Sequence, residues 1–275
     1  MTGGMIWALA AVVAGNAQAA PDVAVPLAPS GKWVVEHEDN VCVLSRTFGG
    51  GPGGAVSFGV KPLTLSKFVT VVVIAPVGIA KRANPADAAR IVLSPSNQSI
   101  AVTADTHGVL PTGETVAMLS IDRSALPALL QATSLTIAAG DVAVAIAPTA
   151  GLGAAKALAT CETQLTTRWG IDPVALAAVA IPAKENIPLH EMIGTDDYPK
   201  GSVATRKGGD SMLVWKIGTD GKVSECRAVQ SAGDARLDAA GCNAITRRGT
   251  FTPARAVDGT AIASWRSTVM KWRNP

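Results

Sequence analysis

The sequence predicts an α+β fold, with a β-rich N-terminal domain and a small strand–strand–helix–strand module at the C-terminus. Short apolar runs separated by Gly, Pro, Asn and Asp recur along most of the chain, which is typical of strands and tight turns. A helical spacing of apolar residues interrupts this pattern at 236–248. With 275 residues and 48% hydrophobic content, the chain has enough material for two buried cores.

The first 19 residues are expected to form a signal peptide. Residues 5–14 are an apolar run, and Ala-Gln-Ala at 17–19 fits a cleavage site. The run is too short to cross a bilayer, which needs about 20 apolar residues. No Lys or Arg precedes the run, so an uncleaved anchor is the alternative. We favour export with cleavage.

Residues 20–31 form a Pro-containing leader without a packing pattern, and the β-rich domain is expected to span 32–170. A short helix is expected at 125–132, and a longer one at 152–169 that ends at Gly170. The expected strands lie at 33–35, 41–44, 55–60, 68–75, 90–94, 99–104, 114–121 and 142–147. Residues 171–196 contain three prolines and are interpreted as a linker.

The C-terminal module is expected to occupy 197–275. Strands at 211–217 and 222–229 flank Asp220-Gly221, a strong hairpin signal. Apolar residues then recur at helical spacing from Arg236, and Gly249 is placed to end this helix. Asp258-Gly259 marks another turn before a final strand at 261–271.

The order and spacing of several short motifs in this module resemble the C-terminal domain of TonB-type energy transducers. They are Asp197-Tyr198-Pro199, residues 220–223, Ser231-Ala232-Gly233, Leu237-Asp238, residues 251–254 and Gly259. The resemblance covers residues 197–272. It implies a periplasmic domain that adds a segment of an outer-membrane transporter to its own sheet and passes on energy from an inner-membrane motor complex.

One departure concerns the rest of the chain. Transducers of this family usually carry an inner-membrane anchor and a long Pro-rich spacer, and no such spacer is found here. The resemblance therefore implies a periplasmic binding module, with inner-membrane anchoring and contact with the motor complex as the alternative. The role of residues 32–170 is left open.

The final strand is the expected partner-binding edge, because an exposed sheet edge pairs with a foreign backbone. Trp265 is assigned to the core, whereas Trp272 is expected to be exposed near the end of the chain. The expected partner-binding residues are Ser264, Arg266, Thr268, Met270 and Trp272. Donors on this strand suit an acidic or polar peptide.

Charge is distributed unevenly along the chain. Residues from 197 onward hold 13 Lys and Arg against 7 Asp and Glu, and the remainder holds 11 against 14. No run of Lys or Arg exceeds two residues. We interpret this as a solvated surface rather than a nucleic-acid-binding site.

Four cysteines are present and none forms a Cys-x-x-Cys motif, so disulfides are expected in an exported chain. Three pairings are possible in principle. The proposed domain division favours Cys42–Cys161 and Cys226–Cys242, each within one domain.

No motif argues for catalysis, a metal or a cofactor. His190-Glu191 lacks the second histidine of a metalloprotease helix, and Gly151-x-Gly153 lacks the third glycine of a dinucleotide loop. Residues 36–39 cluster one His with three carboxylates, and a solvated strand is the favoured interpretation. The alternative function is an enzyme or ligand-binding protein whose site lies in 32–170, with the C-terminal module used for docking.

Overall fold

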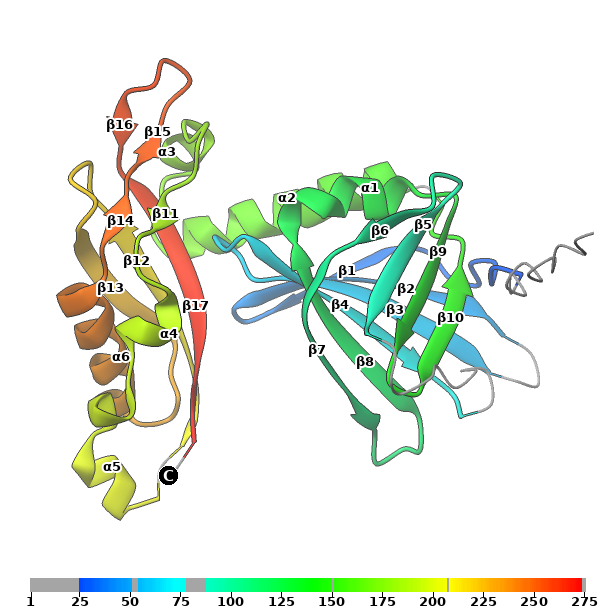
Figure 1. The fold of residues 1–275 in the computed structure, drawn as a ribbon, viewed down its shortest axis with the longest axis horizontal. Helices are drawn as coiled ribbons and strands as arrows, with labels where there is room; N and C mark the ends of the chain where they lie inside the picture. The colour runs from blue at the N-terminus through cyan, green and yellow to red at the C-terminus, as the bar shows by residue number, and fades with distance from the viewer. Residues whose placement is uncertain (1–24, 51–53, 78–87, 150, 207, 274–275) are drawn as a thin grey trace, which may run out of the picture.

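The computed structural model describes residues 25–50, 54–77, 88–149, 151–206 and 208–273. Two bodies lie side by side in Figure 1, a larger β-rich N-terminal one and a smaller C-terminal one. The predicted α+β class is confirmed. The expected signal peptide, at 1–19, lies outside the described residues.

Two antiparallel sheets make up the N-terminal region, and side chains alternate between buried and partly exposed along their central strands. The first sheet has the order β1 (Val34–Glu38), β2 (Val41–Gly49), β3 (Ala55–Pro62), β4 (Phe68–Ala75), β8 (Thr115–Asp122) and β7 (Val102–Val109). The second has the order β10 (Val142–Ile146), β9 (Ser134–Ala139), β5 (Arg90–Ser94) and β6 (Gln98–Ile100).

The buried faces of both sheets share one core, built mainly from Val, Leu and Ile. Three aromatic rings, those of Trp33, Phe48 and Phe58, pack edge to face with centroids 6.2–6.4 Å apart, and the two phenylalanines are fully buried in this core. Leu27 adds to this core and bridges to Ile146 of β10. The described end of the leader therefore packs on the sheets, which its sequence did not indicate.

The helices of the N-terminal region are η1 (Arg123–Ala125), α1 (Leu126–Gln131) and α2 (Gly151–Arg168). A Cβ at position 151 would lie 1.9 Å from the Leu130 carbonyl oxygen, so α2 starts against α1 only because residue 151 is glycine. This close approach explains why residue 151 is a glycine, although Gly151-x-Gly153 partly resembles a dinucleotide-binding loop. Gly170 has φ +70° and follows the end of α2, as predicted.

The C-terminal region contains the predicted strand–strand–helix–strand order. Its antiparallel sheet has the order β13 (Val223–Gln230), β12 (Gly209–Ile217) and β17 (Ser264–Trp272). Helix α6 (Ala235–Arg248) covers one face, where Leu213, Trp215 and Ile217 pack with Ile245. The Asp220-Gly221 turn is confirmed, with Gly221 at φ +77°.

The segment that joins the two regions is ordered along most of its length. Its elements are α3 (Pro173–Ala177), β11 (Lys184–Glu185), α4 (Leu189–Met192), η2 (Thr195–Asp197) and α5 (Lys200–Ala204). Strand β11 pairs with β14 (Phe251–Thr252). The division into domains at 170 and 197 stays a prediction.

Two predicted strands are divided in the structure. The final strand at 261–271 becomes β16 (Ala261–Ile262), which pairs with β15 (Ala254–Arg255), and β17, which pairs with β12. The strand at 99–104 becomes β6 in one sheet and β7 in the other. In both cases the chain leaves one strand partner and joins another within a residue or two.

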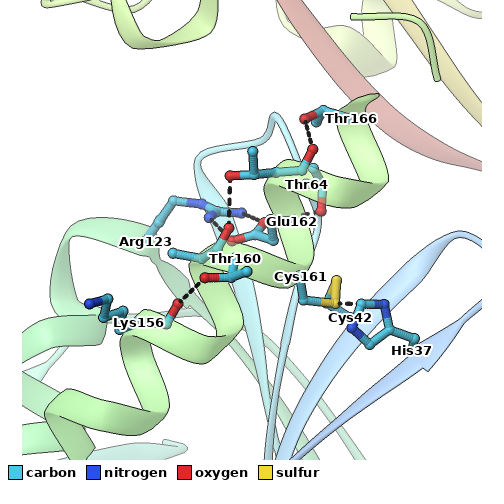
Figure 2. Close-up of a disulfide and its surroundings, with 11 residues drawn as sticks. His37, Cys42, Thr64, Arg123, Lys156, Thr160, Cys161, Glu162 and Thr166 are labelled. Atoms are coloured by element: carbon cyan, nitrogen blue, oxygen red, sulfur yellow. Dashed lines mark hydrogen bonds and ion pairs between the residues drawn. A yellow bond between two sulfur atoms is a disulfide. The ribbon is translucent and has the colours of Figure 1, made fainter. Parts of the chain in front are cut away.

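Both predicted disulfides are confirmed. Cys42 on β2 is bonded to Cys161 on α2 across a Cα–Cα distance of 6.1 Å (Figure 2). Cys226 on β13 is bonded to Cys242 on α6 across 5.4 Å. Each bond therefore ties a helix to the sheet that it covers.

Candidate partner-binding edge

Strand β17 is an edge strand of the C-terminal sheet. It pairs with β12 over nine consecutive positions, from Gly209 opposite Trp272 to Ile217 opposite Ser264. No other described strand pairs with it. Its second side therefore leaves main-chain donors and acceptors free for another strand.

The five predicted partner-binding residues share the face of β17 that α6 covers. The strand register places Arg266 opposite Trp215, Thr268 opposite Leu213 and Met270 opposite Ser211. A Cβ on Gly241 of α6 would lie 3.4 Å from the Trp272 ring and 3.6 Å from the Met270 side chain. Ser264 and Trp272 are buried inside the module, whereas Arg266, Thr268 and Met270 also line a groove beside the strand.

Trp272 is buried, with 4% of its surface exposed, so the prediction that it is exposed is wrong. Its indole Nε1 donates to the Ser211 Oγ at 3.0 Å, and its ring packs edge to face with Tyr198 at 5.4 Å. The register explains this, because Trp272 lies on the helix-covered face of the sheet.

An aspartate on α6 connects strand β12 to the turn at residues 231–233, which precedes the helix. Asp238 accepts hydrogen bonds from the Ser211 hydroxyl at 2.5 Å, the Ser231 hydroxyl at 2.5 Å and the Ala232 N–H at 3.0 Å. Ser211 in turn accepts the bond from Trp272. The motifs Ser231-Ala232-Gly233 and Leu237-Asp238, noted in the sequence, are therefore joined by one hydrogen-bond network.

Two further aspartates fix the helices of the module. Burial opposes the charge of Asp197, but hydrogen bonds from the Gly194 N–H, Arg248 and Arg247 outweigh it and lower the pKa of this carboxyl. Hydrogen bonds from the Arg236 side chain and N–H hold the pKa of Asp234, the N-cap of α6, well below its usual range.

The opposite face of β17 turns towards the N-terminal region (Figure 1). Met212 and Val214 of β12 join the N-terminal core, and Trp265 packs on it beneath the Arg227 guanidinium at 5.0 Å. The Ser267 hydroxyl donates to the Thr64 carbonyl oxygen. One half of this face is thus covered, whereas Val269 and Lys271 farther along are exposed.

A groove of about 560 Å³ runs beside β17 from Arg266 to Lys271. One wall comes from residues 63–68 of the N-terminal region, and the other from residues 185–193, around α4. Lys67, Glu185 and Arg266 meet in this groove. The Glu185 carboxylate lies 2.9 Å from the Arg266 guanidinium and 3.6 Å from the Lys67 ammonium.

Arg123 of η1 and Glu162 of α2 hold the segment at residues 63–67, and Figure 2 shows both beside Thr64. Arg123 makes two 2.9 Å contacts with the Glu162 carboxylate, and it donates to the carbonyl oxygens of Ser66 at 3.0 Å and Leu63 at 3.1 Å. The Thr64 hydroxyl also donates to Glu162, at 3.0 Å. These bonds fix the wall of the groove.

Comparison with known protein families assigns the C-terminal region. Residues 195–272 match the family model of the Gram-negative bacterial TonB protein C-terminal. They form a TonB C-terminal domain. The match leaves the N-terminal region unassigned, and neither curated proteins nor solved structures gave a significant match.

The TonB C-terminal domain suggests a TonB-like energy-transducer role, and this family works in the bacterial envelope. Two disulfides fit an exported protein. Within the part of the chain that the structure describes, no helix is long and apolar enough to cross a membrane. The described residues also hold no group of three or more His, Cys, Asp or Glu side chains that could bind a metal.

The sequence did not indicate Lys67, Glu185 or Thr64 as part of this site. Glu185 lies 81 positions from its partner Arg266, and Thr64 lies 203 positions from its partner Ser267. Lys67 reaches the site through Glu185, which is 118 positions away in the sequence (185 − 67). No local sequence pattern predicts these residue pairs, because the partners are distant in the sequence and meet only where the two regions pack together. The sequence identified the edge and three of the side chains on β17 that line its groove, Arg266, Thr268 and Met270. It did not identify the lining residues that come from other parts of the chain.

Proposed function

We propose that this chain is a TonB-like protein that captures an extended segment of an outer-membrane transporter as an added strand on β17. The free edge of β17, beside an open groove, is the observation that carries this proposal. Main-chain hydrogen bonds supply affinity in this type of recognition, and pockets for alternate side chains supply specificity. The family assignment of residues 195–272 supplies the class of partner.

The location that fits this role is the periplasm, reached through a signal peptide at residues 1–19. The two disulfides support an oxidising compartment. If that segment stays uncleaved, the chain is held at the inner membrane and faces the periplasm, where a motor complex becomes a second partner.

The proposed role is binding rather than catalysis. The three histidines lie on separate elements, and each contacts a different side chain. His37 on β1 contacts the Cys161 Sγ at 3.5 Å, and His107 on β7 lies 3.4 Å from Asp105. His190 lies on α4, beside the groove at β17. This distribution supports a site built from main-chain groups.

A pair of proline variants tests strand addition. Neighbouring residues of a strand direct their N–H groups to opposite sides, so Thr268→Pro and Val269→Pro remove donors from opposite edges of β17. The donor that faces β12 is needed for stability, and the other is needed only for the partner. We expect one variant to lose thermal stability and the other to keep it but lose the partner.

Partner capture is measured by crosslinking in intact cells, followed by mass spectrometry of the purified adducts. The wild-type chain and a Val269→Thr control, which keeps its N–H, should both yield an outer-membrane transporter. If the stable proline variant yields the same adduct in the same amount, strand addition at β17 is wrong.

A further inference from the structure

The groove beside β17 is built by two regions of the chain, and its charged residues come from both. We propose that Lys67 and Arg266 form a carboxylate-binding position in this groove, and that this position selects partner segments that carry an acidic residue. In the structure, the Glu185 carboxylate fills this position. This inference rests on the proposed strand addition and names the chemistry that the added strand must present.

Charge along the groove favours an acidic occupant. Its described lining residues include the cations Lys67, Arg266 and Lys271, and Glu185 is the acidic residue among them. Arg266 is 11% exposed in its side chain, so its charge requires a carboxylate neighbour. Lys67 contacts the same Glu185 carboxylate, but its side chain is half-exposed. Its ammonium group is therefore accessible to a second carboxylate from a partner.

The Lys67 position is held in place before any partner arrives. Arg123 binds the carbonyl oxygens of Leu63 and Ser66, and its own N–H donates to the Lys67 carbonyl oxygen at 2.7 Å. The Ser66 hydroxyl accepts from the Phe68 N–H at 3.2 Å. A side chain on a fixed backbone loses less conformational freedom on binding, and this preorganisation favours selectivity.

Glu185 occupies the place that a partner carboxylate would take. It lies on β11, a strand of two residues that pairs with β14, so only a short element holds it there. An incoming carboxylate can replace Glu185 beside the two cations without leaving Arg266 unpaired. A neutral residue at the same position offers no replacement charge, so Glu185 must then stay in the groove.

Two synthetic peptides test this selection on the full chain. Both have seven residues of alternating valine and threonine with blocked ends, and they differ only in a central glutamate or glutamine. Fluorescence anisotropy gives the dissociation constant of each. We expect the glutamate peptide to bind the wild-type chain roughly fivefold more tightly, the range of a partly exposed ion pair with charge-assisted hydrogen bonds.

Three variants locate the effect. Lys67→Ala should bring the ratio of the two affinities close to one, whereas Lys156→Ala, which removes the same charge from an exposed position outside the groove, should leave the ratio unchanged. Glu185→Gln should strengthen binding of the glutamate peptide, because the competing carboxylate is gone. Carbodiimide coupling should join the peptide glutamate to the Lys67 amine, and mass spectrometry identifies that amide.

The outcomes separate this inference from strand addition itself. If both peptides bind and the stable proline variant of β17 loses both, while Lys67→Ala leaves their ratio unchanged, only the carboxylate position is overturned. If neither peptide binds the wild-type chain, both proposals are overturned. If the chain is a dimer that this proline variant dissociates, a second copy occupies the edge and the peptide assignment is overturned.

Discussion

Replacing Cys226 and Cys242 by alanine is expected to lower the free energy of unfolding of the C-terminal region by about 3 kcal/mol. The bond closes a loop across 16 positions, and the loss of loop-closure entropy in the unfolded chain gives this value. The Cys42–Cys161 bond spans 119 positions, so the same relation gives about 5 kcal/mol for its removal from the N-terminal region.

The two double-alanine variants should differ less in their loss of melting temperature than in their loss of unfolding free energy. A loss of 1 kcal/mol lowers the melting temperature of a domain of 60–100 residues by about 4–8 °C, and that of a domain of 150–250 residues by about 2–4 °C. The C-terminal region, within the first size range, should thus lose about 12–24 °C without its bond. The N-terminal region at 32–170 lies just below the second size range and should lose at least about 10–20 °C without its own.

Urea denaturation of the wild-type chain and of the two double-alanine variants measures these losses. Circular dichroism follows both sheets, and amide hydrogen exchange read by mass spectrometry assigns each transition to its region, because tryptophans of the chain lie in both cores. Each variant should lower the transition of the region that contains its bond. A loss below about 1 kcal/mol for the short loop, or equal losses in both transitions from either variant, would refute the loop-entropy reasoning.

Two more predictions concern aspartates of the TonB C-terminal domain. Asp238→Asn should cost about 2 kcal/mol in urea denaturation, because a neutral amide replaces the carboxylate that accepts from Ser211, Ser231 and the Ala232 N–H. Asp197 has a lowered folded-state pKa, so its stabilisation is present above its unfolded value of about 4 and is lost as the pH falls below it. Asp197→Asn should lower stability at pH 7 and flatten the acid dependence below about pH 4; an unchanged acid dependence contradicts this role.

Local signals were enough to predict most of the C-terminal domain. The Asp220-Gly221 turn, the apolar spacing in 236–248 and the even cysteine count each have one favoured structural outcome. They depend on neighbours in sequence or on chemistry that few residue types provide. The N-terminal strands at 55–60 and 68–75 were predicted for a similar reason, since apolar runs ended at turn residues.

Elements without such a signal were missed. Strand β9 joins β5 and β10, but its Ser134–Ala139 sequence runs into a longer apolar stretch that hides its bounds. Most of β7 was missed because seven of its eight residues are exposed, so no apolar alternation marks it. Both strands are set by their neighbours in the sheets.

The candidate site was predictable only in part. The sequence indicated β17 as an edge, but the orientation of its side chains depends on the register with β12, which a one-residue shift would reverse. Trp272 is buried for this reason. The Lys67–Glu185–Arg266 cluster depends on the packing of two regions, and no pattern within either region encodes it.

The long antiparallel pair of β12 and β17 also has a mechanical consequence. Its nine opposed positions run the length of both strands. Tension applied along the axis of a strand that lies beside β17 acts on all of these main-chain bonds in shear, so the load is shared among them. Tension applied across the strands would instead open the bonds one at a time from an end. A domain with this geometry resists a lengthwise pull better than a sideways one.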